Sequence, residues 1–235
     1  MLKAATKNGA VLAFFAIAST SLVVATHTLT KDKIVFHEQQ TLLKQLEQVI
    51  PEQMRDNQLS QSCTLVTSPR YLGTNNPMPV YIARLRGMQS GLAMETIAPD
   101  GYNGEIRLLV GFNNYGRITG VRVLEHRETP GLGDKISKKV TNWIDGFKGK
   151  RLELRHNGNT VDGSTSATYK GNANVQFASL TLKQWKVRKD GGQFDAFSGA
   201  TITTRAVVKA TKNASLLYHQ VAKSIGRKSL NCIAK

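Results

Sequence analysis

Cysteine is scarce in this sequence: only two occur among 235 residues, Cys63 and Cys232. They form no Cys-x-x-Cys pair and no cluster with histidine, which argues against a zinc or iron–sulfur site. If the domain lies outside the cytoplasm, the two thiols could form a disulfide between an early loop and the C-terminal tail. The alternative is two unrelated thiols, and the sequence leaves both open because it does not fix the distance between their Cα atoms.

Arrangements typical of an independent enzyme are also lacking. There is no Ser/His/Asp set, no Cys/His pair and no pair of carboxylates at a recognisable spacing. The chain has no arginine-rich run and no RNA-binding motif with interleaved aromatics, so its net charge of +16 does not predict nucleic-acid binding. Anionic membrane headgroups or an acidic partner suit this charge better.

One charge-free stretch, residues 8–30, stands near the N-terminus. Its apolar part is long enough for a helix that crosses a bilayer, which needs about 20 residues. We interpret residues 1–30 as an uncleaved membrane anchor; the alternative is a signal peptide, for which Val23-Val24-Ala25 is a poor cleavage site. Lys3 and Lys7 favour an N-terminus on the inner side, although two lysines just beyond the stretch oppose this.

The remaining length fits one compact domain with an appendage. Residues 31–79 are predicted to form an amphipathic helix over 37–57, interrupted by Pro51, and then a turn-rich linker from 60 to 79. The domain is expected over 80–226, with a tail at 227–235. Its expected strands lie at 80–86, 87–97, 105–112 and 118–124, followed by a short helix at 137–147. The stretch 152–189 is turn-rich, with turns at 157–158, 162–163 and 171 and a strand or short helix at 175–182. A final helix is expected from Ile202 to about Gly226.

The final helix is preceded by small and hydroxyl residues, Ser198-Gly199-Ala200-Thr201. A helix start exposes unpaired backbone N–H groups and the positive end of the helix dipole, which together suit a phosphate. Gly199 and Ala200 would let a bulky anion approach the backbone, and Thr201 offers a hydroxyl at that point. The competing interpretation is that Ser198 is an ordinary N-cap.

A second backbone-rich loop follows the strand at 118–124 and contains Glu128-Thr129-Pro130-Gly131-Leu132-Gly133. Taken alone, Gly131-x-Gly133 is a weak phosphate signal, because it lacks the third glycine and the lysine of nucleotide-binding loops. His126 alone favours a structural role, since nothing nearby makes it a metal ligand or a catalytic base.

The two segments together resemble a known family. Asp195-x-x-Ser-Gly-Ala-Thr201 is similar to the motif on which flavin transferases attach FMN, and the stretch 126–136 resembles the flavin-binding loop of the FMN-binding domain family. Segments 102–106, 116–121 and 143–150 match the same pattern in order. With the N-terminal anchor, residues from about 10 to 225 resemble the G subunits of the Rnf/Rsx-type ion-translocating electron-transport complexes.

This resemblance implies an α+β fold: an N-terminal transmembrane helix followed by one FMN-binding domain with an antiparallel sheet and flanking helices. It implies FMN held covalently by a phosphoester to Thr201, with further cofactor contacts and a residue, Asp195, that serves recognition by the flavin transferase. The implied cofactor contacts are Ser198, Gly199, Ala200, Glu128, Thr129, Pro130, Gly131, Leu132 and Gly133.

The implied function is electron transfer between ferredoxin and NAD, coupled to ion translocation, or the reduction of a redox-sensing regulator. The expected partners are the other subunits of the membrane complex and a flavin transferase for maturation. The expected location is the bacterial inner membrane, crossed once, with the domain on the periplasmic side. The sequence leaves two alternatives open: the C subunit of a sodium-translocating NADH:quinone reductase, and a non-redox basic module at the membrane surface.

Overall fold

A computed structural model describes residues 2–153, 155–156, 159–160 and 178–232. The chain divides into two units, the first ending at Leu42 and the second beginning at Leu43. The first unit is the greater part of α1 (Leu2–Val49), and its segment Thr6–Lys31 has the length and composition of a membrane-spanning helix. The helix predicted over 37–57 is present as far as Val49, as the end of α1, and the interruption at Pro51 is confirmed. Beyond Pro51 the prediction was wrong, because only the short 3-10 turn η1 (Glu52–Met54) follows.

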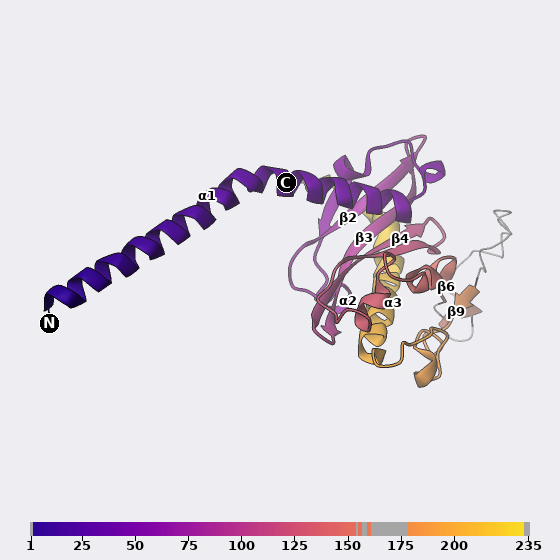
Figure 1. The fold of residues 1–235 in the computed structure, drawn as a ribbon. Helices are drawn as coiled ribbons and strands as arrows, with labels where there is room; N and C mark the ends of the chain where they lie inside the picture. Colours follow the sequence, from indigo (N-terminus) through magenta and orange to yellow (C-terminus); the bar gives the residue numbers. More distant parts are fainter. Residues whose placement is uncertain (1, 154, 157–158, 161–177, 233–235) are drawn as a thin grey trace. The chain divides into compact units, whose positions relative to one another are not determined.

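The second unit is built on a five-stranded antiparallel sheet whose strands lie in chain order (Figure 1). The four strands predicted at 80–86, 87–97, 105–112 and 118–124 are confirmed, with tight connections between them. A fifth strand and a short helix occupy the stretch expected to be a loop at 60–79, where four-residue elements carry too little pattern to recognise. The elements are η2 (Leu59–Gln61), β1 (Cys63–Val66), α2 (Pro69–Leu72), β2 (Met78–Leu85), β3 (Met88–Gly101), β4 (Gly104–Asn113) and β5 (Ile118–Glu125).

Helix α3 (Thr201–Ile225) covers one face of the sheet and closes the core. Its apolar residues recur at three and four positions, as an amphipathic helix requires. They meet alternate residues of the central strands, which all point to the same face. Fully buried members of this core include Ile82, Leu92, Met94, Leu108, Val110 and Val207.

The opposite face of the sheet receives the end of α1, from Leu43 onward. Gly111 and Gly120 are paired across β4 and β5, and both lie against Val49. A Cβ added at Gly111 would be 2.5 Å from the Val49 carbonyl oxygen, and one at Gly120 would be 3.1 Å from the Val49 Cα. The same carbonyl accepts a hydrogen bond from the Thr119 hydroxyl. Two residues without a Cβ therefore let the helix end approach the sheet backbone directly.

Along the chain between β5 and α3, the described residues form only short elements. The helix expected at 137–147 is wrong: two 3-10 turns, η3 (Gly133–Ile136) and η4 (Trp143–Phe147), stand on either side of an irregular stretch. The turns expected at 157–158, 162–163 and 171 lie outside the described residues, as do residues 175–177 of the element expected at 175–182. The remaining elements are β6 (Lys150–Leu152) parallel to β9 (Ala178–Leu180), β7 (Arg155–His156) paired with β8 (Asn159–Thr160), and η5 (Arg188–Asp190).

The two cysteines are joined in a disulfide, with their Cα atoms 5.5 Å apart. The bond attaches the tail to strand β1 at the edge of the sheet. Asn231 strengthens this attachment: its backbone N–H donates to the Cys63 carbonyl at 3.2 Å, and its side-chain oxygen accepts from the Leu65 N–H at 2.7 Å.

Candidate functional site

The turn before α3 has an open backbone. The Ala200 N–H donates to the Phe197 carbonyl at 3.2 Å, and Gly199 has φ +80, a conformation that favours glycine. The helix begins at Thr201 with Ala200 as its N-cap, and no side chain of the described residues caps it. The interpretation of Ser198 as the N-cap is therefore wrong. In the described part of the chain, the N–H groups of residues 201–203 have no hydrogen-bond acceptor, which leaves three donors directed at the space before the helix.

The Thr201 hydroxyl lies beside an ammonium group. Lys189 Nζ donates to Thr201 Oγ1 at 3.2 Å, from the short turn η5. Lys189 was not predicted from the sequence, because the chain returns through Gly191 and Gly192 to bring residues twelve positions apart into contact, and no motif spacing signals this.

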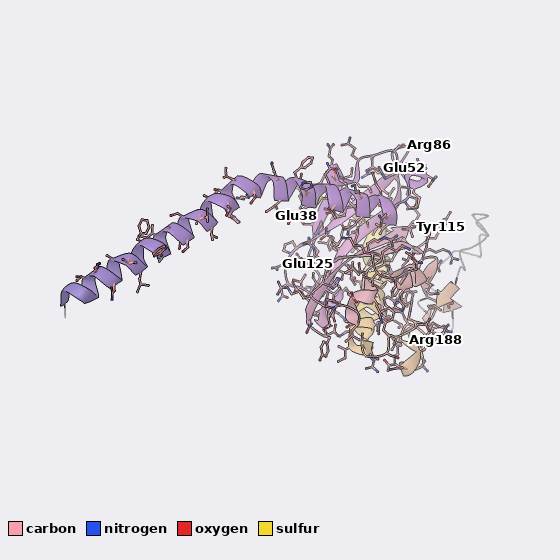
Figure 2. The ribbon with its side chains drawn as sticks, in the orientation of Figure 1. Glu38, Glu52, Arg86, Tyr115, Glu125 and Arg188 are labelled. Carbon is pink, nitrogen blue, oxygen red and sulfur yellow. A yellow bond between two sulfur atoms is a disulfide. The ribbon has the colours of Figure 1, made fainter. Side chains whose placement is uncertain are left out.

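The carboxylates near Lys189 are already paired with arginines. Arg205 holds Asp190 through two hydrogen bonds of 2.7 and 2.6 Å, and these bonds lower the pKa of the Asp190 carboxyl. Arg188, at the surface of the folded unit in Figure 2, pairs with Asp195 at 3.1 Å. Both groups of this second pair are about two-thirds exposed, at 68% and 67%. The Lys189 ammonium is thus directed at the Thr201 hydroxyl.

Asp195 faces Arg188 in this structure, while its backbone holds the segment in place. Its carbonyl accepts a hydrogen bond from the Trp143 ring nitrogen at 2.9 Å. The Trp143 ring also packs against Phe197, with the ring centroids 5.4 Å apart, and against Phe147 at 5.5 Å. Aromatic packing of this kind fixes the entry to the turn and leaves the Asp195 carboxylate exposed.

The loop 128–133 is organised around a single carbonyl group. The Thr129 oxygen accepts from the N–H groups of Leu132 at 3.2 Å, Gly133 at 3.1 Å and Asp134 at 3.4 Å. Gly131 has φ +77 within this turn, with no atom near the position of a Cβ. The loop is therefore a compact turn held by its own backbone.

The structure brings this loop to the turn before α3. A Cβ at Gly199 would be 3.3 Å from Leu132 Cδ2, and the buried Glu128 accepts a hydrogen bond from the Thr203 hydroxyl at 2.7 Å. Leu132 and Ile202 are exposed by 44% and 48%, so apolar surface flanks Thr201. The two segments singled out from the sequence, 65 or more positions apart, thus form one site.

The residues present suit a flavin nucleotide. The unpaired N–H groups and Lys189 suit its phosphate, and the exposed Leu132 and Ile202 offer an apolar surface to a flat ring. Residues 101–215 match the FMN-binding domain family, and residues 1–49 match the RnfG N-terminal region. Fold and site therefore define an FMN-binding domain preceded by an N-terminal apolar helix.

Similar proteins extend this match to the whole chain. The G subunit of the ion-translocating oxidoreductase complex of Vibrio parahaemolyticus is 51% identical over 232 residues, covering 99% of this chain and 98% of the relative. The G subunit from Aliivibrio fischeri is 47% identical and covers 100% of both chains, and that of Shewanella baltica is 46% identical over 97% of this chain and 96% of the relative. The chain belongs to the family of G subunits of the Rnf-type ion-translocating oxidoreductase complexes.

This family membership confirms the resemblance to the G subunits found in the sequence. It favours that family over the two alternatives, the C subunit of the quinone reductase and a non-redox basic module. The α+β fold with an N-terminal apolar helix and an antiparallel sheet is confirmed as well. FMN is the cofactor that the domain implies, electron transport is its role, and a single pass through a membrane fits the apolar segment Thr6–Lys31.

Proposed function

We propose that this chain is a membrane-anchored electron carrier whose FMN is attached through a phosphoester to Thr201 Oγ1. One observation supports this assignment above others: the Thr201 hydroxyl stands at an uncapped helix start, beside the Lys189 ammonium at 3.2 Å. An ester phosphate formed there would keep about one negative charge, next to three backbone donors and a cation.

The surrounding residues would hold the nucleotide in separate ways. Gly199 has φ +80, which favours glycine in this turn, and its neighbours Ser198 and Ala200 are small. The loop 128–133 would present backbone groups and the Leu132 side chain to the flavin ring, with Pro130 stiffening the loop. FMN, when bound, supplies the one-electron chemistry, and the chain orients it and sets its surroundings.

Attachment requires a flavin transferase, and Asp195 is the proposed recognition residue. Its carboxylate is 67% exposed and paired only with the exposed Arg188 among the described residues. Such a group is accessible to a second protein. We assign it no contact with the attached phosphate, because two like charges side by side would repel.

Within its complex the carrier is proposed to pass electrons between ferredoxin and NAD, coupled to ion translocation, or to reduce a redox-sensing regulator. Its partners are the other subunits of the complex. We place it in the bacterial inner membrane with the domain in the periplasm. The disulfide between Cys63 and Cys232 supports this placement, since disulfides persist in oxidising compartments.

The test is to produce the full chain with a flavin transferase and to view the denatured protein in a gel under ultraviolet light. We expect wild-type protein to fluoresce, Thr201→Ala to be dark, and Thr67→Ala, at an exposed threonine away from the site, to fluoresce like wild type. Mass spectrometry of the peptide that contains Thr201 would locate the added FMN. A dark wild-type band, or a fluorescent Thr201→Ala band, would contradict the proposal.

A further inference from the structure

Glu128 is a buried carboxylate held by neutral donors. The residue is 5% exposed, its Oε2 accepts from the Thr203 hydroxyl at 2.7 Å, and its Oε1 accepts from the Asn103 N–H at 3.3 Å. In the parts of the chain that are described, no basic side chain lies within ion-pair distance of it. Burying a carboxylate is costly unless hydrogen bonds compensate, so these two bonds strongly constrain where Glu128 can lie.

Two glycines, Gly133 and Gly101, pack closely against the Glu128 carboxylate. A Cβ at Gly133 would be 2.6 Å from Glu128 Oε2 and 3.1 Å from Thr203 Oγ1, and one at Gly101 would be 2.8 Å from Glu128 Oε1. A larger residue at Gly133 would displace the carboxylate or its Thr203 donor, and one at Gly101 would also meet the Gly104 carbonyl oxygen at 2.2 Å. Glu128 therefore has essentially one arrangement, with the chain packed on both sides of it.

The carboxylate joins three segments that are distant in the sequence. Asn103 belongs to the turn between β3 and β4, and its side chain also donates to the Thr129 hydroxyl at 3.2 Å. Thr203 belongs to the first turn of α3, two residues after Thr201. Glu128 itself begins the loop that carries Leu132. The position of that loop relative to Thr201 thus depends on one buried side chain.

We propose that Glu128 is a positioning residue that fixes the loop 128–133 against the first turn of α3 before any flavin is attached. Its two side-chain oxygens are occupied inside the protein, so it acts through the loop, in place of the direct cofactor contact that the resemblance implied for Glu128. The consequence for the ring rests on the proposed function above, whereas the fixation of the loop is a property of the chain without flavin.

The first experiment measures hydrogen exchange of the full chain without flavin, at the N–H groups of residues 132–134. Thr203→Val removes the donor while keeping the side-chain shape, and we expect exchange there to become faster on the order of 10- to 100-fold. Thr203→Ser keeps the hydroxyl and should exchange like wild type. Thr204→Val is the matched control, because the Thr204 hydroxyl is equally buried but donates within its own helix, to the carbonyls of Ala200 at 3.3 Å and Thr201 at 3.0 Å.

The second experiment measures the fluorescence anisotropy of the attached flavin in the same variants. We expect a lower anisotropy in Thr203→Val than in wild type or Thr204→Val, since a released loop no longer restrains the ring. Glu128→Gln, which keeps the size but removes the charge, provides the same comparison should Thr203→Val fail to fold.

The outcomes separate the two proposals. Equal exchange in wild type, Thr203→Val and Glu128→Gln would overturn the role of Glu128 in holding the loop. Faster exchange with unchanged anisotropy would overturn its role in positioning the ring. A wild-type chain that acquires no flavin would overturn the proposed function, while the exchange measurement would still decide whether Glu128 holds the loop.

Discussion

A single lysine, outside every motif recognised in the sequence, lies against the hydroxyl proposed to carry the flavin. Lys189 reaches Thr201 Oγ1 while the neighbouring Asp190 and Asp195 are engaged by Arg205 and Arg188. An ammonium group in this place can orient the hydroxyl before attachment and pair with the phosphate afterwards.

We therefore expect Lys189→Met to slow the attachment of flavin to the purified chain on the order of 10-fold, because one charge-assisted contact is lost. The measurement is the initial rate of label incorporation with a flavin transferase. Lys183→Met, at another exposed lysine of the same segment, removes the same charge and should keep the wild-type rate. Equal slowing in both variants would show that net charge matters and not the contact, and a wild-type rate in Lys189→Met would show that neither does.

At the scale of elements, the end of α1 depends on the glycine pair of β4 and β5. The Val49 backbone occupies the space that side chains at Gly111 and Gly120 would fill. The buried Leu46 and Ile50 complete the packing. Close approach of this kind leaves little room to adjust, because protein interiors are densely packed.

Gly111→Ala should lower the free energy of unfolding by about 1–3 kcal/mol, since the added Cβ would be 2.5 Å from the Val49 carbonyl oxygen. Urea unfolding followed by tryptophan fluorescence measures the change. Gly146→Ala, where a Cβ would meet no atom within 4 Å, is the control and should leave stability nearly unchanged. A Gly111→Ala protein as stable as the control would refute the packing argument.

The elements also show what a sequence can and cannot predict. Strands β2 to β5 were predictable because alternating apolar residues and Gly-containing turns are local signals. Strand β1 and the two 3-10 turns were not, since each is too short to show a period. The position of Thr201 at the start of α3 was predicted, but the contact from Lys189 and the burial of Glu128 arise only when distant segments meet.

For the whole molecule, the disulfide links residues separated by 169 positions. A covalent link over so long a loop reduces the conformational freedom of the unfolded chain, which is worth about 2–5 kcal/mol in typical cases. We expect the Cys63→Ser, Cys232→Ser double variant to lose stability by about that amount in urea unfolding. Reductant should destabilise wild type in the same way and leave the double variant unaffected; a reductant effect on the double variant would point to a different cause.

The attachment of the tail to β1 has a further consequence for association between molecules. An unpaired outer strand can add a strand from another chain and so start a fibre. Here Asn231 occupies the Leu65 N–H and the Cys63 carbonyl on that outer side, and the covalent bond keeps it there. Asn231 and Cys232 thus cover the outer side of β1, so that strand is not free to pair with a strand of a neighbouring molecule.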